Sequence, residues 1–186
     1  MKRFFDFSFA IILFILFIIP MLIIAISIRL TSRGPALHWS KRIGKNNVIY
    51  KMPKFRSMVI NTPDIETDLL VNPSFYLSSI GSFLRSTSLD ELPQLFSIIK
   101  GDMCFVGTRP ALYNQYDLIS LRKEKGVDKL LTGITGWAQV NGRDELSIAD
   151  KVALDVEYLN RQSFWFDMKI LWMTFLRVAK RDGIRH

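Results

Sequence analysis

The run FAIILFILFIIPMLIIAISI, residues 9–28, decides the fold of this chain. Ser27 is the only strongly polar side chain in the run, which has the length that a membrane helix needs. A cleaved signal peptide has a shorter apolar region that ends at a small-residue cleavage site, whereas this run continues into basic sequence. The run therefore predicts a helix that stays in the membrane.

Two features of this run argue against an ordinary membrane span. Pro20 lies near its middle, where it removes a helix hydrogen bond and bends the axis. Lys2 and Arg3 precede the run and Arg29 follows it, so the positive-inside preference draws both ends to the cytoplasmic side. A re-entrant, broken helix satisfies both features. A kinked span whose short N-terminus crosses the membrane is the alternative, because proline is tolerated in membrane helices.

The composition narrows the class of protein. The 186 residues are enough for one compact domain, and the formal charge of +8 suits nucleic acid, anionic lipid or a phosphorylated substrate. Cys104 is the single cysteine, so the chain forms no internal disulfide. The two histidines, His38 and His186, stand apart, which argues against a His-based zinc site and a Ser-His-Asp triad.

The pattern after the apolar run predicts an α+β fold that is predominantly helical. Residues 36–55 alternate loosely between apolar and polar around a turn at 44–47, which indicates a small β-hairpin. Residues 88–91 match a capping box before a short helix over 92–99, and Lys100-Gly101 is typical of its end.

Two further helices and a loop are predicted in the second half of the chain. Residues 133–142 hold three glycines and predict a loop, and residues 147–160 predict a surface helix with a Ser-x-x-Asp cap. Residues 164–181 place Trp172 on an apolar face opposite Arg177. This last pattern fits a core-facing helix or a helix that lies at the membrane interface.

Asp90 and Glu91 are the first candidates for chemistry. Acids in the first turn of a helix are common because they cap it, and most such pairs have no catalytic task. The same position keeps a carboxylate ionised and attracts phosphate. An ionised Asp90 could bind Mg²⁺ or attack phosphorus.

Five basic residues, spaced along the chain beside small or turn-forming residues, outline a phosphate receptor. Arginine presents a planar fork that matches two phosphate oxygens at once. Taken singly, each residue is more often a surface or ion-pairing side chain, so the hypothesis depends on their convergence in space. The five are Lys54, Arg56, Arg85, Arg109 and Arg143.

Four stretches together resemble the signature of the bacterial sugar transferase family, the monotopic phosphoglycosyl transferases. They are KFRSM (54–58), RSTSLDELPQLFSIIKGDMCFVG (85–107), TRP (108–110) and GITGWAQVNGR (133–143). The similarity extends from the apolar N-terminus to the closing aromatic helix, and the chain looks like the small form of the family. The resemblance implies a single domain over 1–186, with a re-entrant membrane helix over 1–30 and a catalytic part, cytosolic and interfacial, over 31–186.

The resemblance also implies a two-step transfer at the cytoplasmic face of the bacterial inner membrane. Asp90 would attack the β-phosphate of a UDP-sugar, expel UMP and form a covalent phosphosugar intermediate, which polyprenyl phosphate then attacks. Glu91 would assist the acceptor step, Mg²⁺ would lie near Asp90, and the five cations would bind substrate. The small form suggests an N-acetylated or other modified amino sugar. The implied partners are inner-membrane lipid, downstream glycosyltransferases and a second copy of the chain, with no nucleic acid.

The chain departs from the family pattern in three places, and other functions compete. Ile19-Pro20 stands where members often have Ser-Pro, and Thr108-Arg109-Pro110 replaces Pro-Arg-Pro. Met52-Pro53 interrupts the strand-like stretch before Lys54. A membrane-attached scaffold without catalytic activity is the first alternative, although it leaves Asp90, Glu91 and the ordered cations unexplained. Nucleic-acid binding lacks a recognisable motif and must account for the apolar run.

Overall fold

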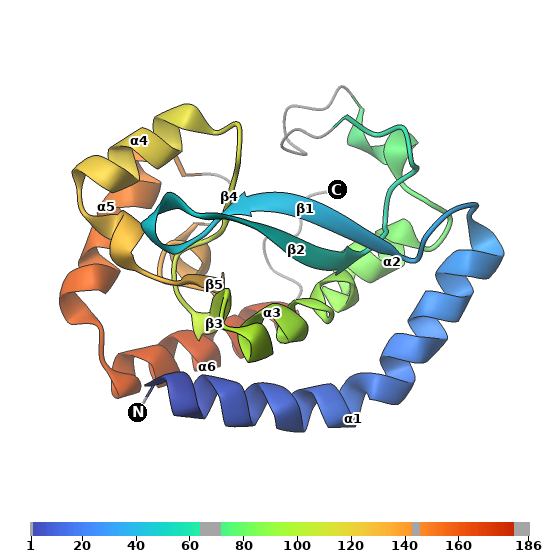
Figure 1. Ribbon diagram of the computed structural model, residues 1–186, viewed down its shortest axis with the longest axis horizontal. Coiled ribbons are helices and arrows are strands. Elements are labelled where there is room, and N and C mark those ends of the chain that lie inside the picture. Colours follow the sequence, from blue (N-terminus) through green and yellow to red (C-terminus); the bar gives the residue numbers. More distant parts are fainter. Residues whose placement is uncertain (1, 64–71, 143–145, 181–186) are drawn as a thin grey trace.

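The computed structural model describes residues 2–63, 72–142 and 146–180. The fold is α+β and mostly helical with a long apolar N-terminal helix, as predicted, and it contains two small sheets (Figure 1). In chain order the elements are α1 (Lys2–Thr31), β1 (Leu37–Ile43), η1 (Lys45–Asn47), β2 (Ile49–Phe55), η3 (Pro73–Tyr76), α2 (Gly81–Ser86), η4 (Leu89–Glu91), α3 (Gln94–Lys100), β3 (Met103–Val106), β4 (Ala111–Leu112), α4 (Tyr116–Glu124), η5 (Val127–Lys129), β5 (Thr132–Thr135), η6 (Gln139–Asn141), α5 (Ile148–Arg161) and α6 (Phe164–Lys180).

Helix α1 is the one described helix that is long and apolar enough to cross a membrane. Figure 1 shows it as two limbs that meet at an angle, and Pro20 inside the helix supplies a physical cause for a bend. Its middle turns apolar side chains outward, with Ile15 and Ile19 each 66% exposed. Surface of this kind is unstable in water, so the middle of α1 requires an apolar environment.

Both ends of α1 are bonded to the same folded domain. At the N-terminal end Lys2 Nζ lies 3.0 Å from the Val106 carbonyl, and Arg3 Nη2 donates to the Ile99 carbonyl at 2.9 Å. At the C-terminal end Arg56 Nη2 donates to the Ser32 carbonyl at 2.9 Å. The domain therefore holds the two ends of a helix whose middle is exposed.

The predicted hairpin is confirmed. Strands β1 and β2 pair antiparallel from Leu37 opposite Phe55 to Ile43 opposite Ile49. The sheet order is β2-β1-β4, so β2 is an edge strand. An edge strand tolerates Pro53, whose missing N–H faces away from the ladder.

Two local predictions were wrong. Ser88 does not form a capping box, because its backbone is left-handed (φ 56°) and its side chain makes no cap bond; η4 follows it, and α3 begins at Gln94. The predicted loop over 133–142 includes most of β5, which pairs parallel with β3. The end of α3 at Gly101 (φ 104°) is as predicted.

Helix α6 turns four of its five aromatic side chains outward and buries Phe166 and a carboxylate. Trp165 is 79% exposed, and Trp172 stacks on Phe175 at the surface with ring centroids 5.8 Å apart. Asp167 is buried, where Tyr158 Oη donates to it at 2.7 Å and Lys2 forms an ion pair with it. The aromatic face is therefore not the core-facing side of this helix, which favours the interfacial alternative.

Candidate functional site

The turn η4 buries Asp90 beside other charges. The side chain is 8% exposed, and burial raises the pKa of Asp90 from 3.8 to about 6. Lys54 and Arg85 lower this pKa, and the Glu91 carboxylate raises it. Sequence reasoning expected a helix start to keep the carboxylate ionised, but desolvation is the larger effect here.

Lys54 and Arg85 converge on the acid pair, as the phosphate-receptor hypothesis requires. Lys54, on β2, donates to Glu91 Oε1 at 2.9 Å, and both side chains are 22% exposed. Arg85 lies in the last turn of α2 and acts on Asp90 through space. The hairpin and two short helices thus bring two cations and two carboxylates to one place.

Three glycines let the backbone that follows β3 approach the backbone of β5 and the residue after it closely. A Cβ on Gly107 would lie 2.2 Å from the Leu131 carbonyl oxygen, and one on Gly136 would lie 1.9 Å from the Gly107 carbonyl oxygen. A Cβ on Gly133 would lie 2.2 Å from the Gly107 nitrogen. This backbone contact brings the segment that carries Arg109 against the end of β5 and the turn η6.

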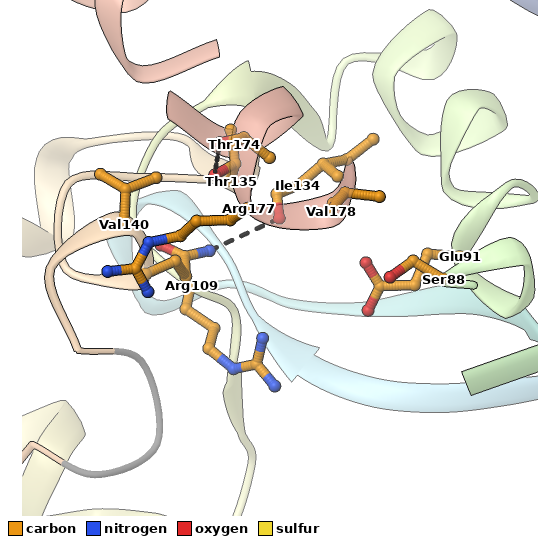
Figure 2. Close-up of a pocket in the computed structure, with 10 residues that line it drawn as sticks. Ser88, Glu91, Arg109, Ile134, Thr135, Val140, Thr174, Arg177 and Val178 are labelled. Atoms are coloured by element: carbon orange, nitrogen blue, oxygen red, sulfur yellow. Dashed lines mark hydrogen bonds between the residues drawn. The ribbon is translucent and has the colours of Figure 1, made fainter. Parts of the chain in front are cut away.

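A pocket of about 130 Å³ opens between these segments, η4 and α6. Figure 2 shows Ser88 and Glu91 at one side of it and Arg109 and Arg177 at the other. The lining residues are Ser88, Glu91, Arg109, Ile134, Thr135, Gln139, Val140, Thr174, Arg177 and Val178. A guanidinium group that faces a carboxylate across a pocket, as Arg109 faces Glu91, suits an anionic ligand that carries its own cation (Figure 2).

A buried ion pair between Arg122 and Asp155 holds the backbone of Arg109 in place. Arg122 donates to Asp155 through Nε at 2.9 Å, and its Nη2 lies 2.7 Å from the same oxygen. Its Nη1 donates to the backbone carbonyl of Arg109 at 2.8 Å. The contact between α4 and α5 therefore fixes the backbone from which the Arg109 side chain extends.

The remaining predicted cations lie elsewhere or outside the described residues. Arg56 is 6% exposed, and its guanidinium donates to the Ser32 and Arg33 carbonyls at the end of α1. Arg56 therefore bonds to the end of α1 and does not line the pocket. Arg143 lies outside the described residues.

Sequence reasoning missed Gln139 and Arg177 as candidate site residues. Arg177 belongs to the polar face of the closing helix, and that face turns toward the pocket. The position of Arg177 on the polar face, opposite Trp172, was the sequence signal that could have identified it. Gln139 stands inside the motif GITGWAQVNGR, but a single glutamine in a glycine-rich segment gives no signal of its own.

Asp90 and Glu91 could together hold a metal ion whose other ligands come from a substrate. Among the residues that the structure describes, no three Asp, Glu, His or Cys side chains group closely enough to hold a metal ion. Mg²⁺ is usually held by one or two carboxylates, with waters and substrate phosphates as the other ligands. Asp90 and Glu91 match that donor set.

The fold and site define a class: a membrane-associated protein with an acid pair beside a pocket that is lined by Glu91 and two arginines. The family profile described as "Bacterial sugar transferase" matches residues 1–181. The chain belongs to the bacterial sugar transferase family.

Three relatives illustrate how far this similarity extends. The chain is 36% identical to "Galactosyl transferase CpsE" of Streptococcus agalactiae, over 99% of this chain and 43% of that protein. It is 38% identical to "Undecaprenyl-phosphate glucose phosphotransferase" of Komagataeibacter xylinus, over 95% of this chain and 35% of that protein. It is 36% identical to "Uncharacterized sugar transferase EpsL" of Bacillus subtilis, over 100% and 90%. The chain thus spans less than half of the first two relatives and most of the third.

Proposed function

We propose that this protein transfers a sugar 1-phosphate from a UDP-sugar to undecaprenyl phosphate or another polyprenyl phosphate and releases UMP. Membership of the sugar transferase family supports the reaction, and relatives named as undecaprenyl-phosphate glucose and galactose phosphotransferases support the acceptor. Such a reaction starts the assembly of a glycoconjugate. It classes the protein as a transferase of substituted phosphate groups.

The observation that carries this proposal is the position of Asp90. A buried carboxylate with a raised pKa, next to a second acid and beside an anion-binding pocket, is a candidate nucleophile. A carboxylate that approaches a diphosphate meets strong repulsion, which Lys54, Arg85 and Arg109 would reduce. A Mg²⁺ ion between Asp90, Glu91 and the diphosphate would supply further charge neutralisation.

The transfer proceeds in two displacements at phosphorus. In the first, an Asp90 carboxylate oxygen bonds to the β-phosphorus, the bond from that phosphorus to the bridging oxygen breaks, and UMP leaves with the bond electrons. In the second, a phosphate oxygen of polyprenyl phosphate bonds to the same phosphorus and Asp90 is released as a carboxylate. Glu91, held by Lys54, stands next to the nucleophile and assists this acceptor step.

The shape of the molecule suits a reaction between a soluble and a lipid substrate. Because one domain holds both ends of α1, a membrane that covers its exposed middle leaves the domain on a single side. We infer a re-entrant, monotopic protein at the cytoplasmic face of the inner membrane, with the aromatic face of α6 among the headgroups. The nucleotide sugar and the lipid phosphate then meet at headgroup depth.

Two groups of sugars are candidates for the donor. The sequence suggested an N-acetylated or modified amino sugar, whereas the relatives carry glucose or galactose in their names. Both groups belong in a substrate panel. UMP release is measured for each UDP-sugar with the full chain in detergent, with Mg²⁺, and with or without polyprenyl phosphate.

The proposal predicts UMP release from at least one sugar and a lipid-linked sugar phosphate when the acceptor is added. Removal of Mg²⁺ with EDTA should stop the release, and added Mg²⁺ should restore it. No UMP release from any member of the panel would contradict the enzymatic function and favour a scaffold.

A further inference from the structure

The pocket contains a buried acceptor that the phosphate transfer does not use. Gln139 is 9% exposed, and its Nε2 donates to the Ile134 carbonyl at 3.5 Å. Its Oε1 is buried and has no hydrogen-bond partner among the described residues. A buried acceptor without a partner costs free energy, so a ligand that brings an N–H or O–H group to it is favoured.

The surroundings of Gln139 restrict the kind of ligand. Ile134 and Val140 give this end of the pocket an apolar wall, and Arg177 adds a guanidinium donor from α6. In Figure 2 the guanidinium groups of Arg109 and Arg177 point in opposite directions, that of Arg109 toward the side of the pocket where Glu91 lies and that of Arg177 away from it. The pocket thus has one end for an anionic group near the acid pair and another end with mixed polarity.

We propose that Gln139 recognises the uracil ring of the nucleotide through a hydrogen bond. This inference rests on the proposed function and names the subsite for the base. Gln139 Oε1 accepts the ring N3–H, Arg177 donates to a neighbouring ring carbonyl, and Ile134 and Val140 cover a face of the ring. Arg109 then faces the phosphates.

Uracil fits these groups better than a sugar does. A ring N–H between two carbonyl oxygens needs one acceptor with donors beside it, and its faces are apolar. A hexose presents several hydroxyls, each of which donates and accepts, so an apolar wall would leave many of them unpaired. The volume of about 130 Å³ is below the roughly 300 Å³ at which pockets enclose a whole small molecule, so this space suits one group of a larger ligand.

The test measures the binding of UMP and of CMP to the full chain in detergent by titration calorimetry. Cytosine has an acceptor at N3, so a single glutamine acceptor should favour UMP over CMP. Gln139→Met removes the acceptor at similar length, and we expect it to weaken UMP binding about tenfold and to bring UMP and CMP close together. Gln139→Glu keeps an acceptor and should keep the preference for UMP.

Asn141→Ala is the matched control. Asn141 lies in the same turn η6, donates to the Trp137 carbonyl at 2.7 Å and is exposed outside the pocket lining. It should leave UMP binding unchanged. An equal loss in both variants would assign the effect to the turn and would contradict a contact between Gln139 and the base.

Turnover separates this inference from the proposed function. With Gln139→Met, KM should rise by one factor for every UDP-sugar in the panel, because the base is common to all of them. A change in the order of preferred sugars with unchanged UMP binding would show that Gln139 reads the sugar, and would overturn the inference. If the wild-type chain turns over UDP-sugars but Gln139→Met binds UMP normally, the base subsite fails alone. If UMP binding depends on Gln139 but no sugar is transferred, the subsite stands and the transferase function fails.

Discussion

Two buried aspartates in the same domain have opposite surroundings. Asp155, on α5, is 2% exposed and receives two nitrogens of Arg122, at 2.9 and 2.7 Å. Asp90, in η4, is 8% exposed, and Lys54, which lowers its pKa through space, forms its ion pair with the adjacent Glu91. Burial raises the pKa of both carboxyl groups.

We infer from this difference that Asp155 is a structural carboxylate and Asp90 a reactive one. Arg122 satisfies Asp155 directly and joins α4, α5 and the Arg109 backbone. Asp90 shares its cations with a neighbour and lies beside a pocket, so a substrate and its metal ion can complete its surroundings. Asp155 should therefore matter for folding and Asp90 for chemistry.

The largest expected effect is the loss of transfer in Asp90→Asn. The amide keeps the shape of the side chain but cannot bond to phosphorus, so the rate of UMP release should fall at least about a thousandfold. The measurement is UMP release under saturating UDP-sugar. Glu91→Gln is the comparison: it should release UMP faster than Asp90→Asn, because the proposed role of Glu91 is in the acceptor step.

Asp155→Ala should destabilise the fold by about 3–5 kcal/mol, because it leaves Arg122 buried without its partner. Thermal unfolding in detergent measures the change. The double variant Asp155→Leu, Arg122→Met should recover part of the lost stability, since no unpaired charge remains. A single variant as stable as wild type would contradict the structural role of Asp155.

The same comparison predicts that Asp90→Asn is more stable than wild type. Because the folded state raises the pKa of Asp90, the stability due to its protonated form is present at low pH and is lost as the pH rises through about 6. An amide does not ionise, so the variant should gain about 3 kcal/mol near pH 7.5 and less than about 1 kcal/mol near pH 4. Unfolding curves at both pH values test this, and a loss of stability near pH 7.5 would contradict it.

The smallest expected effect is on the pH dependence of transfer. The nucleophile must be ionised, and the pKa of Asp90 is about 6. The kcat/KM for a UDP-sugar should therefore be constant above about pH 7 and about tenfold lower at about pH 5. An acid limb near pH 4 instead would mean that Asp90 is not desolvated in the working enzyme.

The sequence was sufficient where local signals and long motifs carried the information. The hairpin followed from alternation around a turn, and the cap of α5 at Ser147 is formed as predicted, with the Asp150 N–H donating to it at 3.1 Å. Two of the five predicted cations, Lys54 and Arg85, lie near the acid pair, and their binding of phosphate stays a prediction. These features depend on few residues or on motifs that are long enough to be specific.

The parts of the fold and of the site that the sequence did not predict depend on tertiary contacts, which no local sequence pattern contains. All four residues of β3 are buried, so the strand has no alternation, and its partner β5 lies after α4 in the chain. Lys54 and Arg56 stand two positions apart in one motif, yet one reaches the acid pair and the other the end of α1. Gln139 reaches the pocket because three glycines allow close backbone contact, which a sequence does not show.

The central claim, that Asp90 is the nucleophile, is tested most directly by the intact mass of the protein. The full chain is mixed with a UDP-sugar that it accepts and with Mg²⁺, without polyprenyl phosphate, and is then digested to locate any added mass. The account predicts one sugar phosphate on the peptide that contains Asp90, lost when polyprenyl phosphate is added and absent in Asp90→Asn. Transfer to the lipid without any adduct during a single turnover, or an adduct on a different residue, would contradict it.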